Sequence, residues 1–285
     1  MSAFLLKNRK SYPLDRMACA LGLSRAGFYK RLNRKATKRD EADVDLKAKL
    51  LQIYHKSRKT YGLPRLRKAL KDKAIQCGTG RLQKLQKSLQ IQGAIRKPRF
   101  IRTTDSNHDH AISPNLLKRN FATDKPNRVW VSDLTYLRTA QGWLYLCVFL
   151  DLFSRRVVGW SMSDTMEASA TCRALEMALG NRRPSSELII HSDRGVQYAS
   201  TEFRQLLHRH GFVQSMSGKG DCLDNACAES FFGTLKSELA ANVFGSHAEA
   251  RREVFDYIEC FYNTERMHSY LGYKSPLEFE QMKAA

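Results

Sequence analysis

Beyond about residue 126, the hydrophobic positions form short, dense runs instead of helical stripes. Three runs are rich in Val, Leu, Tyr, Trp and Phe, and the gaps of five and four residues between them suit β-hairpins. They are Val129–Leu137, Trp143–Asp151 and Arg156–Met162. This pattern predicts three consecutive antiparallel strands.

The following segments alternate between helical and strand-like periodicity. Met166–Leu179 and Ser200–His210 show apolar residues at helical spacing, and Leu188–His191 between them is a short apolar run. Strands followed by alternating helix and strand predict a mixed sheet covered by helices.

The first 32 residues contain a helix–turn–helix pattern. Gly22 permits the turn, and Ser24 is placed to cap the second helix. That helix carries Arg25, Lys30 and Arg31 outward, which is typical of a DNA-reading helix. An ordinary helical hairpin in a basic protein is the alternative interpretation.

A second helix-turn-helix candidate lies between residues 41 and 95. A helix is expected to start near Tyr61, with Pro64 in its first turn, and Gly78 and Gly80 are expected to interrupt it before the next helix. Basic side chains on the two helices are the candidate DNA contacts: Arg65, Arg67, Arg81, Lys84 and Lys87.

Charge separates the two halves of the chain. Residues 1–120 contain 30 Lys+Arg and 8 Asp+Glu, a net +22, whereas residues 121–285 contain 18 and 20, a net −2; the sum is the chain's +20. A polycationic region indicates a polyanionic partner, most simply nucleic acid, bound with salt-dependent affinity. A basic surface that only provides solubility is the alternative.

These patterns predict four parts: a helix-turn-helix-like segment (1–40), a second helical DNA-binding region (41–95), a basic linker (96–125) and a core with a helical tail (126–285). The seven cysteines are scattered without a CxxC pair, so we expect reduced thiols in a cytoplasmic protein. We expect neither a signal peptide nor a membrane span.

Three carboxylates are the candidate chemical groups. Asp133 lies inside the first strand-like run, Asp193 directly follows Leu188–Ser192, and Glu229 shares a helix side with Lys236. Carboxylates brought together repel each other, and a hard cation such as Mg²⁺ removes that penalty. The three residues therefore predict metal-dependent phosphodiester chemistry. Taken singly, a strand-edge Asp or a solvated Glu is the plainer interpretation.

Two further details of the second half are expected from local sequence. Asp224 or Asn225 is placed to cap the helix that carries Glu229. Residues 240–285 are expected to close the core with a helix and to line a DNA channel, although simple packing explains part of this segment equally well. The residues concerned are Tyr262, Asn263, Arg266 and His268.

Nearly the whole chain resembles the transposase encoded by the second reading frame of insertion sequences of the IS3 family. Asp193 and Glu229 are separated by 35 residues (229 − 193 − 1), which is the spacing of that family, and Lys236 takes the place of its basic residue. The segments that carry the resemblance are Ser24–Tyr29, Tyr61–Leu66, Asn127–Asp133, Gly142–Leu146, Asp151–Arg155, His191–Tyr198, Ser215–Gly220, Asp224–Ala226, Glu229–Phe232 and Tyr262–Leu271.

The resemblance implies an α/β core of the ribonuclease-H-like, retroviral-integrase type, with a mixed five-stranded sheet preceded by an all-α helix-turn-helix region. It implies that Asp133, Asp193 and Glu229 are catalytic, bind two Mg²⁺ or Mn²⁺ ions, and support cleavage at the element ends and strand transfer. Lys236 is then a DNA contact.

The implied partners are double-stranded DNA, namely the terminal inverted repeats and the target, and further copies of the chain on that DNA. The implied location is the bacterial cytoplasm, at the nucleoid. In this family the active enzyme is often a fusion to an upstream-frame helix-turn-helix and leucine-zipper product. The chain shows no sustained heptad repeat, so we expect the second-frame product alone. A DNA-binding regulator with a silent core, and a structure-specific nuclease on the same fold, are the alternative functions.

Overall fold

The computed structural model describes residues 11–20, 22, 24–32, 37–95, 111–218, 222–239, 241 and 243–284. Before residue 96, every described element of secondary structure is an α-helix, which confirms the predicted all-α region. They are α2 (Leu14–Ala20), α3 (Arg25–Leu32), α4 (Lys38–Lys56), α5 (Leu63–Asp72) and α6 (Thr79–Ser88). Within the described residues, no helix is both long enough and apolar enough to cross a bilayer.

Local capping explains where the first helices begin. The Ser24 hydroxyl accepts a hydrogen bond from the Gly27 backbone N–H at 3.1 Å, so the predicted cap of α3 is confirmed. Gly22 in the preceding turn has φ 64°, a conformation that glycine adopts without steric cost. Helix α4 starts with a capping box in which the side chains of Thr37 and Asp40 each bond the other's backbone N–H.

Helices α4, α5 and α6 form a small helical module around buried leucines, including Leu50, Leu66 and Leu82. Pro64 lies in the first turn of α5, as predicted. Gly78 is the N-cap of α6, but Gly80 lies inside that helix, so the expectation that it interrupts the pattern was wrong. In the first turn its backbone N–H has no helical partner, so a glycine costs little there.

The second half contains a five-stranded mixed sheet in the order β3-β2-β1-β4-β5. The hairpins β1–β2 and β2–β3 are antiparallel, and β4 is parallel to both β1 and β5, which confirms the predicted mixed sheet. The strands are β1 (Val129–Thr139), β2 (Gly142–Asp151), β3 (Val157–Ser163), β4 (Ile189–Ser192) and β5 (Val213–Met216).

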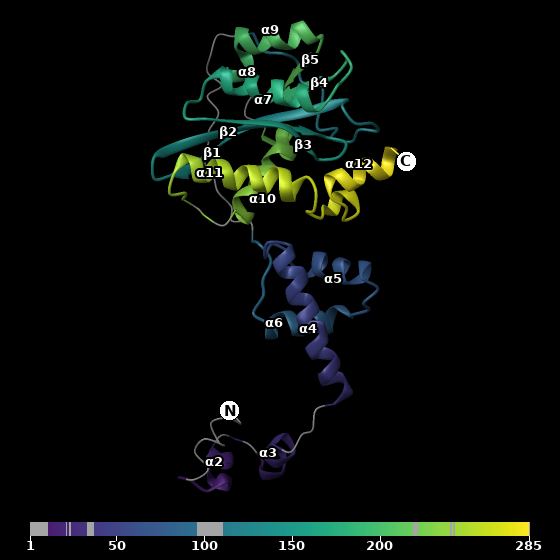
Figure 1. The fold of residues 1–285 in the computed structure, drawn as a ribbon, viewed down its shortest axis with the longest axis vertical. Helices are drawn as coiled ribbons and strands as arrows, with labels where there is room; N and C mark the ends of the chain where they lie inside the picture. Colours follow the sequence, from purple (N-terminus) through teal and green to yellow (C-terminus); the bar gives the residue numbers. More distant parts are fainter. Residues whose placement is uncertain are drawn as a thin grey trace.

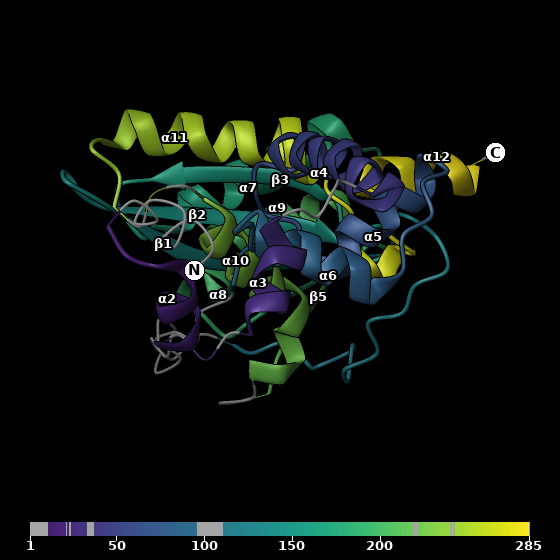
Figure 2. The ribbon, with the colours of Figure 1, turned by 90° about the horizontal axis from the view of Figure 1, so that it is seen from below.

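Helices cover both faces of this sheet, as Figures 1 and 2 show. One face packs against α7 (Ala168–Asn181), α8 (Val196–Ala199) and α9 (Thr201–His210). The other packs against α10 (Ala226–Glu238) and α11 (His247–Phe255), which continues into the π-helical segment η2 (Asp256–Tyr262); α12 (Pro276–Ala284) ends the chain on this side.

The second half of the predicted linker lies against the sheet. The Leu116 backbone N–H donates to the Ser215 hydroxyl at 2.9 Å, and Met216 N–H donates to the Pro114 carbonyl at 3.3 Å. Leu117 is buried in the core. Residues 111–125 therefore pack on the core although their composition has no periodicity, and residues 96–110 lie outside the described part.

The helical module docks on the α10–α12 side of the core. The Tyr61 hydroxyl accepts from Met267 N–H at 2.8 Å and donates to the Glu265 carbonyl at 3.3 Å. Arg65 Nε donates to the Met267 carbonyl at 3.0 Å. Arg58 forms an ion pair with Asp256 at the start of η2. The loop between α4 and α5 is thus fixed to the segment after η2.

The C-terminal motif residues are buried in packing contacts. Asn263 bonds both backbone groups of Val157 on β3 at 3.0 Å, and Arg266 forms a bidentate ion pair with Glu238 at 2.7 Å. Arg266 and Glu238 side chains are each 3 % exposed. The expectation that this motif lines a DNA channel was therefore wrong for Tyr262, Asn263 and Arg266, and the packing alternative holds.

A close approach of β3 to α7 gives a test of the packing. A Cβ on Gly159 lies 2.3 Å from the Ala174 carbonyl oxygen and 2.5 Å from Ala178 N, whereas a Cβ on Gly180 meets no atom within 4 Å. We expect Gly159→Ala to lower the free energy of unfolding by about 3 kcal/mol through overpacking. The matched helical change Gly180→Ala should be neutral or stabilising by about 0.5–1 kcal/mol.

Urea denaturation of both variants measures this difference. Equal stabilities for the two alanine variants would contradict the close β3–α7 contact.

Candidate active site

The pairing of β1 with β4 brings two of the predicted carboxylates together. The parallel register matches Val129 with Ile189 and Val131 with His191. Continued by two residues, it places Asp193 level with Asp133, at the point where the two strands separate. The ladder ends at Val131 and His191, and the two aspartates, each two residues further along its chain, line the same pocket.

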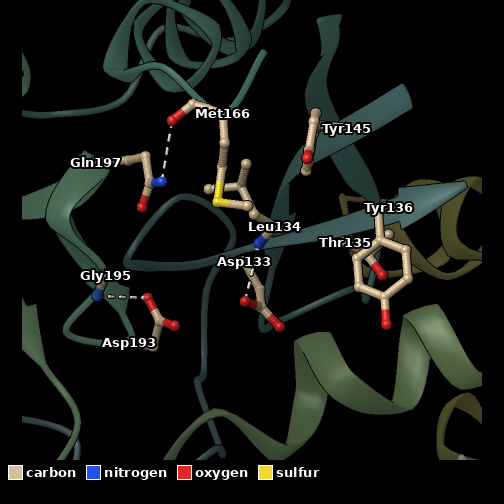
Figure 3. A pocket seen from close by; sticks show the side chains of 9 residues that line it. All are labelled: Asp133, Leu134, Thr135, Tyr136, Tyr145, Met166, Asp193, Gly195 and Gln197. Carbon is tan, nitrogen blue, oxygen red and sulfur yellow. Dashed lines mark hydrogen bonds between the residues drawn. The ribbon is translucent and has the colours of Figure 1, made fainter. Parts of the chain in front are cut away.

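Both carboxylates face one pocket, shown in Figure 3. Asp133 accepts a hydrogen bond from Leu134 N–H at 2.8 Å, and Asp193 accepts one from Gly195 N–H at 3.0 Å. Each bond comes from a backbone N–H one or two residues further along the chain and orients the carboxylate that accepts it. The other residues that line the pocket are Thr135, Tyr136, Tyr145, Met166 and Gln197.

Glu229 lies in the first turn of α10, which packs against β1. Asn225, the N-cap residue of α10, donates from its amide nitrogen to the Ser132 carbonyl at 3.1 Å, directly beside Asp133. Asn225 thus takes the predicted N-cap position, but its side chain makes no capping hydrogen bond. The Asp224 carboxylate is instead occupied by Gly218 N–H at 2.9 Å and by other side chains.

His191 joins the strands to the segment that leads into α10. Its Nδ1 lies 2.8 Å from the Ser215 hydroxyl on β5, and its Nε2 lies 3.1 Å from the Asp224 carbonyl oxygen. Burial lowers the pKa of His191, so the ring is neutral at physiological pH. A neutral ring can donate at one nitrogen and accept at the other, which suits these two contacts.

The site is electrostatically strained. Burial raises the pKa of Asp133 well above its usual range, and the negative charges of Asp193 and Glu229 raise it further. The Leu134 N–H and the positive charge of Lys236 act in the opposite direction. Asp193, Glu229 and Lys236 are therefore each close enough to Asp133 to influence its charge.

The carboxylates do not form a preassembled cage. Among the residues that the structure describes, no three His, Cys, Asp or Glu side chains are grouped closely enough to hold a metal ion. Glu229 is exposed and does not line the pocket of the two aspartates. The three negative charges repel one another, which favours this separation. A cation between them makes their approach favourable instead. A set of carboxylate oxygens whose negative charges repel one another suits a hard divalent ion.

The predicted DNA contacts lie in different environments. Lys236 Nζ lies 4.6 Å from the centre of the Tyr136 ring, beside the acidic site. Lys84 and Lys87 are exposed on α6, and Arg67 is exposed on α5. These positions suit phosphate contacts, and the residues remain predictions.

Three of the predicted arginines have protein partners: exposed Arg67 donates to the Thr79 hydroxyl at 3.2 Å, and Arg65 and Arg81 are held more firmly. Arg65 donates to the core, as described above, and Arg81 forms an ion pair with Asp43 at 2.6 Å. Both side chains are partly buried, so a structural role fits them better than a phosphate contact. Lys30 is exposed on α3, and the side chains of Arg25 and Arg31 lie outside the described part.

Aromatic residues beside the carboxylates were missed in the sequence. Tyr136 and Tyr145 lie directly opposite each other on β1 and β2, and Trp143 packs edge-on against Tyr136 with ring centres 4.8 Å apart. Strand periodicity alone marks them as ordinary strand residues. Only the hairpin register shows that they meet next to Asp133.

Family models agree with this division of the chain. Residues 123–222 and 229–283 each match a model described as an integrase core domain, which supports the integrase-type core. Residues 38–99 match a model described as an HTH-like domain. The first match contains Asp133 and Asp193, and the second begins at Glu229.

Solved structures of retroviral integrases show a distant likeness. A simian T-cell lymphotropic virus intasome, in complex with PP2A regulatory subunit B56 gamma, is 16 % identical, with a TM-score of 0.46 over 82 % of this chain and 74 % of that chain. The HTLV-2 integrase catalytic core domain in complex with magnesium (trimeric form) is also 16 % identical, with a TM-score of 0.42 over 56 % of this chain and 99 % of that chain.

Sequence relatives are much nearer. The insertion element IS600 uncharacterized 31 kDa protein of Shigella sonnei is 41 % identical over 93 % of this chain and 97 % of its own length. Transposase InsF for insertion sequence IS3A of Escherichia coli (strain K12) is 39 % identical over 99 % of both chains. The chain therefore belongs to the IS3 family of insertion-sequence transposases.

Proposed function

We propose that this protein cuts DNA at the ends of its insertion sequence and joins the freed 3′-hydroxyl to another phosphodiester, with Asp133, Asp193 and Glu229 as the catalytic residues. The observation that carries the proposal is that Asp133 and Asp193, each two residues beyond the last β1–β4 pair, line one pocket. The effect of the Asp193 and Glu229 charges on Asp133 supports it.

The same three carboxylates are the proposed ligands of two Mg²⁺ ions, with Mn²⁺ as a substitute. Bound ions would activate the attacking oxygen and stabilise the leaving oxygen of an in-line displacement. Asp133 and Asp193 already share a pocket. Glu229 is exposed on the first turn of α10, so its three side-chain torsions can bring its carboxylate toward them without refolding the helix.

DNA is the proposed partner on both sides of the reaction: the terminal inverted repeats and the target duplex. Lys236 lies beside the carboxylates, where it can hold a phosphate near the reacting groups. Lys84 and Lys87 on α6 offer phosphate contacts away from the site. We further propose that several copies assemble on the two ends, in the bacterial cytoplasm at the nucleoid, and that the upstream-frame product contributes to end recognition.

Metal binding is testable without any reaction. Metal-free Asp133→Asn should exceed the wild type in free energy of unfolding at pH 7.5, because burial and the neighbouring negative charges raise the pKa of Asp133 and make its ionised form costly. The amide removes the repulsion from Asp193 and keeps an acceptor for Leu134 N–H. Added Mg²⁺ should raise the unfolding temperature of the wild type and leave that of the variant unchanged.

Asp164→Asn is the matched control, because Asp164 is an exposed carboxylate that pairs with Arg251. It should respond to Mg²⁺ as the wild type does. An identical Mg²⁺ response in Asp133→Asn would remove this residue from the ligand set.

Strand joining tests the proposed reaction. With Mg²⁺ and duplexes that carry the element ends, the wild type should cleave and join strands. Asp193→Asn should be slower by about 10²- to 10³-fold, since the metal contributes several kcal/mol of transition-state stabilisation. Gel analysis of labelled strands measures both steps, and Asp164→Asn should react normally.

The products separate the alternatives. Cleavage by the wild type without any joining would indicate a structure-specific nuclease. Binding of end DNA without either reaction would indicate a regulator.

A further inference from the structure

Beside the acidic pocket, whose lining includes Tyr136, an aromatic surface extends toward the turn of the β1–β2 hairpin. Strand β1 pairs with β4 only over Val129–Val131, so beyond Val131 its edge is not covered by β4. Figure 3 shows the Tyr136 ring and the Asp133 carboxylate on the same side of β1. The two residues are three apart on a strand, which separates their Cα atoms by about 10 Å.

Trp143 makes this surface unusual. Its side chain is 48 % exposed, whereas Trp130 on the neighbouring strand is fully buried. Trp143 packs edge-to-face against Tyr136, with an interplanar angle of 82°. An exposed indole at a hairpin end does not contribute to the core, and its uncovered ring can accept a planar partner.

The positively charged side chain of Lys236 lies at the same surface. Lys236 Nζ lies 4.6 Å from the Tyr136 ring centre and also acts on the charge of Asp133. The lysine thus links the aromatic surface to the carboxylates. Exposed aromatic rings next to a basic side chain are the elements that bind unpaired nucleotides, with the ring stacking on the base and the cation near its phosphate.

We propose that Trp143, Tyr136 and Lys236 bind an unpaired nucleotide a few positions from the scissile phosphate on the same strand, with its base stacked on the Trp143 ring. This proposal rests on the proposed function, because that function places a DNA strand at Asp133 and Asp193. A stacked, unpaired base near the cleavage point holds the strand away from its complement, and the reacting phosphate is thereby exposed to the carboxylates. The protein should therefore prefer DNA whose bases at this point are already unpaired.

Two synthetic duplexes of equal length test the preference, one fully paired and one with mismatched bases at its end. We expect the wild type to bind the mismatched duplex about tenfold more tightly, within the range of one stacked base. Trp143→Leu, which keeps apolar bulk without a ring, should lose most of this preference. Trp143→Phe should retain it, because it keeps an aromatic face.

Phe255→Leu is the control, since Phe255 is 51 % exposed on α11 and lies outside the pocket. It should bind both duplexes as the wild type does. Fluorescence anisotropy measures the affinities, and 2-aminopurine in the mismatched segment reports stacking directly. Thermal unfolding of each variant shows whether the hairpin remains folded.

The proposal is overturned if the wild type shows no preference, if Trp143→Leu keeps the preference, or if both Trp143 variants lose it together with thermal stability. The last result would assign Trp143 to hairpin packing. Strand joining is scored separately on the paired duplex. A protein that joins strands without preferring mismatched ends refutes the stacking site alone, and one that prefers them but joins nothing refutes the proposed function.

Discussion

Repulsion between carboxylates at one edge of the sheet is the interaction on which the rest of the structure depends. The β1–β4 register sets Asp133 level with Asp193, and burial makes ionisation of Asp133 unfavourable before any third charge is added. Without a metal, this arrangement of carboxylates adds no stabilising interaction, and it lowers the stability of the fold. The surrounding contacts are explained most simply as the means by which the protein maintains that arrangement.

Helix α10 is held at both ends. At its start, Asn225 donates to the Ser132 carbonyl next to Asp133. At its end, Glu238 accepts two hydrogen bonds from the buried guanidinium of Arg266 and one from Tyr257 at 2.9 Å. Removal of one partner from such a buried pair leaves an uncompensated charge, so the end of the helix is strongly fixed. Glu229 is therefore carried on a rigid element, and only its side chain is exposed.

The same ion pair lies next to the helical module. Arg65 of α5 is 3.9 Å from Glu238 and bonds the backbone at Met267, so the module contacts the helix that carries Glu229. This explains why a basic residue in an expected DNA-binding helix is turned toward the protein. The lysines of α6, in contrast, are exposed.

Much of the core could be predicted because its strands are dense apolar runs. Strand β5 was not located, because half of it is polar: Gln214 and Ser215 pair through their backbones and leave no hydrophobic pattern. The packing of residues 111–125 was missed for the same reason. The three carboxylates were predicted from their type, their place beside strand-like runs and the family spacing, and their roles stay a prediction, whereas the aromatic surface required the register that sets Tyr136 opposite Tyr145. The distances between the three carboxylates depend on charge repulsion, and the spacing of residues along the sequence does not determine it.

Anomalous X-ray scattering from crystals grown with Mn²⁺ tests the central claim most directly. The account predicts a Mn²⁺ peak between the carboxylates of Asp133 and Asp193, with the Glu229 side chain turned toward it. A peak coordinated by other residues, or none at this edge of the sheet while Mn²⁺ is bound elsewhere, would contradict it.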